Sequence, residues 1–303
     1  MYRSHHSSEG TPGIDPAELT PPYLQSSAYF SSNAVATQES KPYKAWDTTD
    51  APDNSAALPI TLPPLEQSYS LLTKCVAEFV GDLIFVFVGT MQAHTMAGAD
   101  GVTHAALAHG FTIFILASTL GHISGGHFNP AVSWSVALAG KLPLHHFPCF
   151  VISQLLGGCC GALLTVGILS KAEYENTLGG ATLLASGSEW YQGLIAETVV
   201  TFLLCHTILN TAVDTDSNVL APLAIGLTLS IDIFATGAIT GASMNPARSF
   251  GPNLMGQLFL SKEKLPSTWW SYHYIYWAGP LMGASIASSI FWLFQSRERR
   301  IVA

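Results

Sequence analysis

The triplet Asn-Pro-Ala occurs twice in the chain, and each copy opens a short apolar segment. The copies are Asn129, Pro130 and Ala131, and Asn245, Pro246 and Ala247. Asparagine is a good helix N-cap, and proline suits the next position because its missing N–H would be unpaired there. Each triplet therefore predicts a helix whose N-terminus carries an amide donor and about half a positive charge. Two such ends facing each other would bind a small neutral hydrogen-bond acceptor and repel cations.

The segments that follow the triplets are too short to cross a bilayer. Residues 129–140 and 245–256 would each form a helix of roughly 16 Å, about half of a hydrocarbon core. A half-length helix can enter the membrane only where protein or a water-filled cavity satisfies its backbone. Both segments therefore predict re-entrant half-helices.

Six longer apolar runs could each span a bilayer, which needs about 20 residues. They lie at 71–94, 103–123, 145–169, 190–211, 219–238 and 271–294. Together with the two short segments they predict an all-α membrane protein with six transmembrane helices and two re-entrant half-helices.

The chain repeats itself around the two triplets. ISGGHFNPAVSW at 123–134 aligns with ITGASMNPARSF at 239–250. Each half, about 68–170 and 186–296, carries three spans and one half-helix. Because three is odd, the second half enters the membrane with the opposite polarity, giving an inverted 3+3 repeat with its site near the midplane. A water held between the two asparagines must point its hydrogens outward, which interrupts a proton wire.

Composition places the chain in the membrane and excludes a nucleic-acid binder. Charged residues make up 11% of the sequence, whereas an ordinary soluble domain has about 25%. The net charge is −8, and no cluster of Lys and Arg offers phosphates a partner. The five cysteines show no C-x-x-C pairing, so we expect no metal site.

The ends of the chain differ from its middle. Residues 1–66 hold eight acids and three bases without apolar periodicity, so we expect a disordered N-terminal tail. Residues 297–303 form a short basic C-terminus. Six spans put both ends on one side, and the basic residues favour the cytoplasm. We expect a multi-pass protein of the plasma membrane rather than of an intracellular membrane.

The sequence resembles the aquaporins, or major intrinsic proteins. The likeness lies in the boxes HISGGHFNPAV and ITGASMNPARSFGP and in AEF and AET at the start of the first and fourth spans. It makes 67–296 the channel domain. The resemblance implies an hourglass fold, passive transport of water or small neutral solutes, and a homotetramer with one pore per subunit. Its partners would be the lipid bilayer and the permeating solutes, with no enzymatic activity and no cofactor.

The resemblance also assigns a selectivity filter to His109, Ile233, Ala242 and Arg248. Strict water channels of the family carry Phe and His where this chain has His109 and Ile233. That difference resembles the aquaporin-8 and plant tonoplast branch, whose members pass water together with ammonia and, in some cases, hydrogen peroxide or urea. Glycerol facilitators typically carry Asp where Ser249 stands, so we expect little glycerol transport. The alternative is a buried core histidine at 109 and a structural cation at 248.

Two glutamates recur at the same place in the two halves. Glu78 and Glu197 could mark an ion or proton pathway. Because they recur, we interpret them as buried acceptors for the N–H groups of the re-entrant loops. We expect His127 to shape the loop before the first triplet. Asp82, one turn after Glu78, is matched by Thr201 in the second half, and the pattern gives it no role.

Two other functions share parts of this pattern. Secondary transporters also have inverted repeats and intramembrane carboxylates. A closed-pore structural or junctional membrane protein would show negligible permeability. Saturable, gradient-driven uptake would favour the transporter, whereas a flux linear in concentration would favour the channel.

Overall fold

The structure is a computed structural model that describes residues 69–95, 100–214 and 218–301, with side chains up to Gln295. All regular elements within these ranges are helical. The predicted tail at 1–66 lies outside the described residues.

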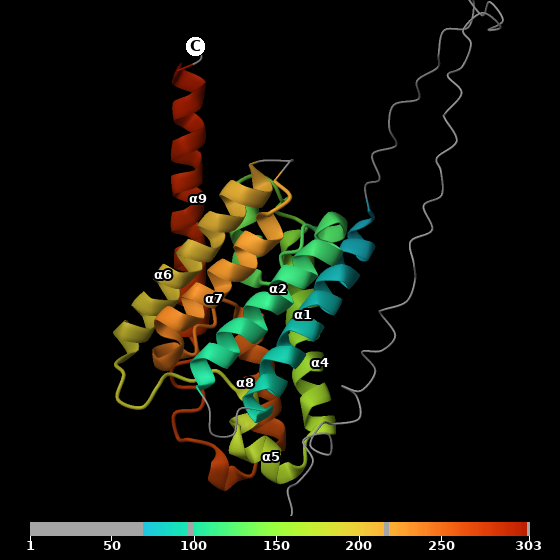
Figure 1. The fold of residues 1–303 in the computed structure, drawn as a ribbon, viewed down its shortest axis with the longest axis vertical. Helices are drawn as coiled ribbons and strands as arrows, with labels where there is room; N and C mark the ends of the chain where they lie inside the picture. Colours follow the sequence, from blue (N-terminus) through green and yellow to red (C-terminus); the bar gives the residue numbers. More distant parts are fainter. Residues whose placement is uncertain (1–68, 96–99, 215–217, 302–303) are drawn as a thin grey trace, which may run out of the picture. The chain divides into compact units, whose positions relative to one another are not determined.

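Within the described residues the fold consists of six long helices and two half-helices, joined by short connecting elements (Figure 1). The long helices are α1 (Leu71–Thr95), α2 (Gly101–Ser124), α4 (Phe147–Ile168), α6 (Trp190–Ile208), α7 (Ala221–Thr240) and α9 (Ile275–Ile301). The half-helices are α3 (Pro130–Leu138) and α8 (Pro246–Phe259). The connecting elements are α5 (Lys171–Asn176), η4 (Leu178–Gly180), the π-helical turn η5 (Leu209–Val213) and η6 (Lys262–Lys264). The chain is thus an all-α membrane protein with the predicted order of helices.

Five of the described helices are long and apolar enough to cross a membrane by length and composition, namely α2, α4, α6 with η5, α7 and α9. The sixth, α1, has 25 residues but carries Lys74, Glu78 and Asp82. Glu78 and Asp82 are completely buried, so both carboxyl groups face the protein interior.

The predicted span at 190–211 corresponds to α6 continued by the π-turn η5, which together run from Trp190 to Val213. One predicted boundary was wrong, because the last helix begins at Ile275 instead of 271. Residues 266–274 instead form successive turns, and Trp269 is fixed there because its indole N–H donates to the carbonyl of Asn253 at 3.1 Å.

The two halves use glycine in the same way to bring helices together. Gly110 of α2 and Gly226 of α7 lie 116 positions apart, and a Cβ on either would meet the carbonyl oxygen of the other. In the first half Gly161 packs against the backbone of α1, and in the second Gly283 packs against that of α6. Small residues allow such close approach in membrane helix pairs. The result is close pairing of α1 with α4, α6 with α9 and α2 with α7.

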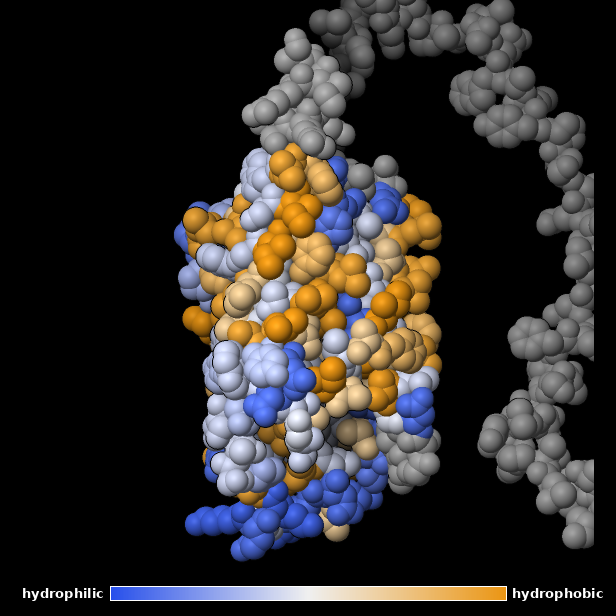
Figure 2. Space-filling model, turned by 90° about the vertical axis from the view of Figure 1, so that its left-hand side faces the viewer, coloured by the Kyte–Doolittle hydropathy of each residue, from blue (hydrophilic) through white to orange (hydrophobic). Residues whose placement is uncertain are grey.

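Each half-helix packs against the other half of the chain: α3 against α9, and α8 against α4. This exchange brings the N-termini of α3 and α8 to the same place. On the outer surface, large apolar side chains are exposed along the long helices, for example Leu72, Ile115, Ile152, Val199 and Ile231. Figure 2 shows many apolar residues across the upper and middle parts of one face, and hydrophilic residues gathered at its lower end.

Candidate functional site

The side chains of Asn129 and Asn245 cap the two half-helices and cross between the two halves. Asn129 Oδ1 accepts from the N–H of Ala131 at 2.8 Å, and Asn245 Oδ1 accepts from the N–H of Ala247 at 2.9 Å. The amide of Asn129 donates to the carbonyl of Met244 at 2.9 Å. The amide of Asn245 donates to the carbonyl of Phe128 at 2.7 Å. Each asparagine therefore fixes its own helix and the loop of the other half.

The loops that lead into the two caps have matching backbone conformations. Phe128 and Met244, which lie 116 positions apart, have φ angles of 45° and 55°. Gly126 and Ala242, separated by the same offset, have φ angles of 65° and 45°. Non-glycine residues in this left-handed region store strain of about 1–3 kcal/mol each, which the surrounding structure must offset.

Glu78 supplies that support in the first half. Its carboxylate accepts from the N–H groups of His127 at 3.0 Å and Phe128 at 2.6 Å. It also accepts from the hydroxyl of Ser124 at 2.5 Å and the amide of Gln154 at 2.8 Å. Four donors around one buried carboxylate hold the strained loop against α1 and α4.

Glu197 has the corresponding place in the second half. It accepts from the N–H groups of Ser243 at 2.9 Å and Met244 at 2.7 Å. His127 Nδ1 lies 3.0 Å from the hydroxyl of Ser133 on α3, so this histidine joins the first loop to the half-helix that follows. Glu78 and Glu197 thus each accept from two backbone N–H groups of a loop that leads into a half-helix, and His127 lies in the first of these loops.

A narrow cavity lies beside the two caps. Its volume is about 20 Å³, which is room for a water molecule. Asn129 and Asn245 line it together with apolar side chains that include Phe85, Leu204 and Leu229. This central cavity shares His127 and other lining residues with a wider one of about 660 Å³ beside Lys74.

A third cavity, of about 340 Å³, is lined by three of the four predicted filter residues, His109, Ile233 and Arg248. Ala242, the fourth, is buried and is not among the described residues that line this cavity. The ring of His109 lies edge-on to that of Phe85 at 5.4 Å, and Phe85 lines the central cavity.

The hydrogen bonding of His109 fixes its tautomer. Nδ1 lies 2.8 Å from the carbonyl of Ala105, and a carbonyl can only accept, so Nδ1 carries the hydrogen. In the neutral ring Nε2 is then an acceptor. No described protein group pairs with it. Gly89 lies against this atom, and a Cβ there would approach it to 2.5 Å.

Arg248 is held by a loop whose role the sequence did not indicate. Its guanidinium donates to the hydroxyl of Thr182 and, at 3.4 Å, to the carbonyl of Gly180. The side chain of Asn253, on the same half-helix, accepts from the N–H of Thr182 at 3.0 Å and donates to its carbonyl at 3.3 Å. Thr182 and Asn253 belong to neither triplet and show no local pattern, so only their position beside Arg248 distinguishes them.

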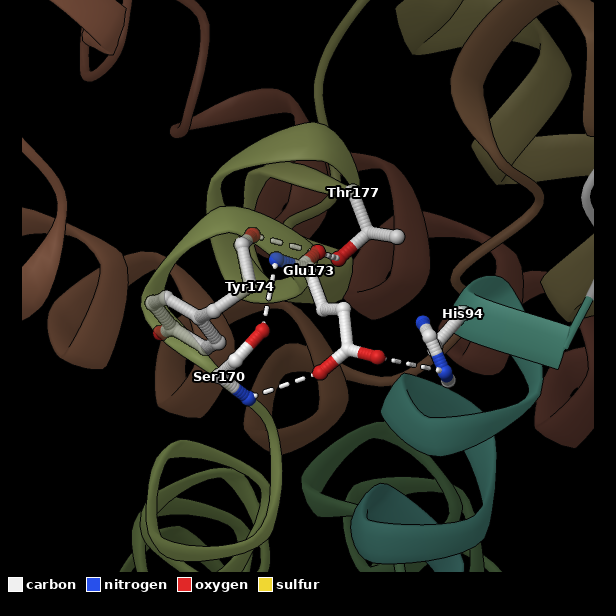
Figure 3. A network of polar contacts seen from close by, with 5 residues as sticks. All are labelled: His94, Ser170, Glu173, Tyr174 and Thr177. Carbon is white, nitrogen blue, oxygen red and sulfur yellow. Dashed lines mark hydrogen bonds and ion pairs between the residues drawn. The ribbon is translucent and has the colours of Figure 1, made fainter.

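The start of this loop is tied to the end of α1 (Figure 3). Ser170 and Glu173 form a capping box on α5, and Glu173 also pairs with His94 Nε2 at 3.5 Å. The hydrogen bonds from the Ser170 hydroxyl and backbone lower the pKa of Glu173, and His94 adds a smaller effect. Tyr174, also on α5, is buried in a cluster with Leu260 and Trp269. Burial raises the pKa of its hydroxyl to about 12.

Comparison with known proteins identifies the family to which a chain with these two capped half-helices belongs. A model of the major intrinsic protein family matches residues 66–291. The chain belongs to the major intrinsic protein family. It is 37% identical over 230 residues to aquaporin-8 of Rattus norvegicus, covering 75% of this chain and 83% of that protein. It is 39% identical over 227 residues to aquaporin TIP1-2 of Musa acuminata, covering 71% and 84%.

The fold is also similar to that of a solved channel structure. The crystal structure of the aquaglyceroporin from Plasmodium falciparum aligns with a TM-score of 0.63 at 19% identity, covering 73% of this chain and 96% of that one. The chain is therefore a multi-pass membrane channel of the aquaporin fold, in a family of water channels rather than enzymes.

Proposed function

We propose that residues 67–296 conduct water together with ammonia and hydrogen peroxide, with urea as a further candidate, and exclude protons and ions. The observation that carries the proposal is the pair of asparagine caps, each bonded to the loop of the other half, beside a cavity with room for about one water molecule. Both caps sit at helix N-termini, where the macrodipoles repel cations. A water that accepts a hydrogen bond at the caps points its own hydrogens away from the donor, which interrupts proton transfer along a single file of water molecules.

The filter in this proposal consists of His109, Ile233, Ala242 and Arg248. Arg248 would supply donors and a positive charge, and Nε2 of His109 would supply an acceptor. Ile233 and Ala242 would leave apolar walls. A small molecule that both donates and accepts recovers part of its desolvation cost of a few kcal/mol here. Ammonia and peroxide meet that condition, whereas glycerol is larger and has three hydroxyls to satisfy.

The proposed assembly is a homotetramer with one pore in each subunit and both termini in the cytoplasm. The excess of Lys and Arg on the side of the two termini supports this orientation. We propose that the protein resides in the plasma membrane. Imaging the location of the full-length chain in cells would test this proposal.

Stopped-flow light scattering on proteoliposomes tests the function. We expect flux of water, ammonia and peroxide that is linear in concentration, little glycerol flux, and no collapse of an imposed pH gradient. Saturable uptake would instead favour a transporter, and the absence of water flux would favour a closed pore.

The filter assignment has its own test. The double variant His109→Phe with Ile233→His should keep water flux and suppress ammonia and peroxide flux. If both solute fluxes equal those of the parent channel, the filter residues have been assigned wrongly.

A further inference from the structure

Asp82 is a buried carboxyl group that the proposed pore does not use. It lies on α1, one turn after Glu78, and is completely buried. Its Oδ1 lies 3.5 Å from the amide nitrogen of Asn245. Its Oδ2 has no hydrogen-bond partner among the described protein groups. A buried polar atom of this kind needs an explanation, because most such atoms are paired.

The contact makes the two asparagine caps unequal. An asparagine amide has two hydrogens. Asn129 donates one of them to Met244, and no second protein acceptor for its amide is present in the described part of the chain. The amide nitrogen of Asn245 donates to the carbonyl of Phe128 at 2.7 Å and has a second acceptor, Oδ1 of Asp82, at 3.5 Å.

The corresponding position in the second half carries no carboxyl group. Position 201 on α6 lies 119 residues after position 82, as Glu197 lies 119 after Glu78. It holds Thr201, which is also completely buried and whose hydroxyl has no partner among the described groups. Beside the caps, the first half therefore carries a buried carboxyl group where the second half carries a hydroxyl.

We propose that Asp82 is a positioning residue that sets the selectivity of the channel by drawing the second amide hydrogen of Asn245 away from the pore. A molecule between the caps then meets one free side-chain donor, that of Asn129. The inference rests on the proposed function, since it concerns which molecules pass between the caps.

The number of free donors discriminates between permeants by their lone pairs. Water has two lone pairs and gains from two donors. Ammonia has one lone pair, so a single donor satisfies it fully. With one donor withheld, water loses a hydrogen bond at the midpoint that ammonia could not have used. Asp82 thus raises the permeability of ammonia relative to that of water.

The test compares three variants of the full-length chain in proteoliposomes. Asp82→Ala frees the hydrogen, whereas Asp82→Asn keeps an acceptor oxygen and a similar shape. Thr201→Ala is the matched control, because it removes the equivalent unpartnered group from the other half. The measured quantity is the ratio of ammonia to water permeability, which does not depend on how many channels are folded.

We expect the ratio to fall about threefold in Asp82→Ala, as one hydrogen bond of modest net strength predicts. It should stay at the parent value in Asp82→Asn and Thr201→Ala. An unchanged ratio in Asp82→Ala, or an equal fall in Thr201→Ala, would overturn the proposal. If Asp82→Ala does not fold, Asp82→Thr takes its place, since threonine already occupies the equivalent buried position.

A second measurement separates this inference from the proposed function. Solid-state NMR of the side-chain amides reports contact with water. In the parent protein Asn129 should show water contact at one hydrogen and Asn245 at neither, and Asp82→Ala should add a contact at Asn245. Water contact at Asn245 in the parent overturns the role of Asp82 whether or not ammonia passes. Absence of ammonia flux in the parent, with the predicted NMR pattern, would instead contradict the proposed solute range alone.

Discussion

The guanidinium of Arg248 donates a hydrogen bond to the hydroxyl of Thr182, across 66 positions of sequence. The peptide of Thr182 is itself held on both sides by the amide of Asn253. The half-helix α8 therefore carries the arginine and also fixes the loop that orients it. A change at Thr182 therefore alters a direct contact of Arg248.

Replacing Thr182 with valine should lower water permeability per channel about threefold to tenfold. Valine fills the same space but leaves a guanidinium N–H without its acceptor, and hydrogen bonds to charged groups are worth about 1.5–3 kcal/mol. The freed N–H would hold passing water longer. The control is Thr182→Ser, which retains the hydroxyl and should behave like the parent in the same stopped-flow assay. Equal losses in both variants would contradict this account.

Replacing Glu78 with glutamine should destabilise the channel by about 3 kcal/mol. The variant puts an NH₂ group where the carboxylate accepts hydrogen bonds, so at least one of its four donors loses its partner in a buried site. Thermal unfolding in detergent measures the loss. Glu173→Gln, in an exposed capping box, is the comparison and should shift the unfolding temperature far less.

Mercurials applied from either side should inhibit the parent channel only weakly. The predicted filter residue Ala242 has no thiol, and Cys205 is buried. No cysteine is among the described residues that line the three cavities along the pore. Introducing one by Ala105→Cys, in the wall of the cavity beside Arg248, should confer inhibition that a reducing agent reverses. Strong block of the parent would show that another cysteine reaches the pore.

Stability should fall as the pH is lowered from about 6.5 to about 4 because of His273. This side chain lies in the turns before α9, and its ring packs 4.8 Å from that of Trp270. Burial lowers the pKa of His273 to about 4, and neither ring nitrogen has a partner among the described groups. The unfolded chain binds a proton at about pH 6.5 and the folded chain only near pH 4, so acid favours unfolding between these values.

The size of this effect is about 1–2 kcal/mol, allowing for partial exposure of the ring. His273→Phe keeps an aromatic ring in the same place and cannot bind the proton. Thermal unfolding in detergent at pH 7 and pH 4.5 should show a smaller difference for this variant than for the parent. The same difference in both proteins would place the acid sensitivity elsewhere.

Local chemistry explains why much of this architecture could be predicted. An asparagine and a proline start a helix through their own backbone and side-chain preferences, so α3 and α8 begin where the triplets do. Long apolar runs form helices in a membrane because the backbone must satisfy itself there. The repeat then implied that the glutamates at 78 and 197 have equivalent neighbours, as their contacts with the two loops show.

Helix ends were less predictable, because distant partners decide them. The turns at 266–274 replace the first turn of the predicted last helix, and Trp269 is held there by the carbonyl of Asn253 on α8. Hydropathy alone cannot distinguish an apolar turn from an apolar helix.

The sequence by itself determined the two capped half-helices, the inverted repeat and the positions of the buried glutamates, since each follows from local preference or internal symmetry. Only the tertiary structure decided that Thr182 orients Arg248, that Nε2 of His109 has no partner among the described protein groups, and that Asp82 reaches Asn245. These contacts join residues far apart in the chain or depend on which face of a helix is turned inward. No local sequence pattern specifies the partners in these contacts. The contacts can therefore be recognised only once the packing of the helices is known.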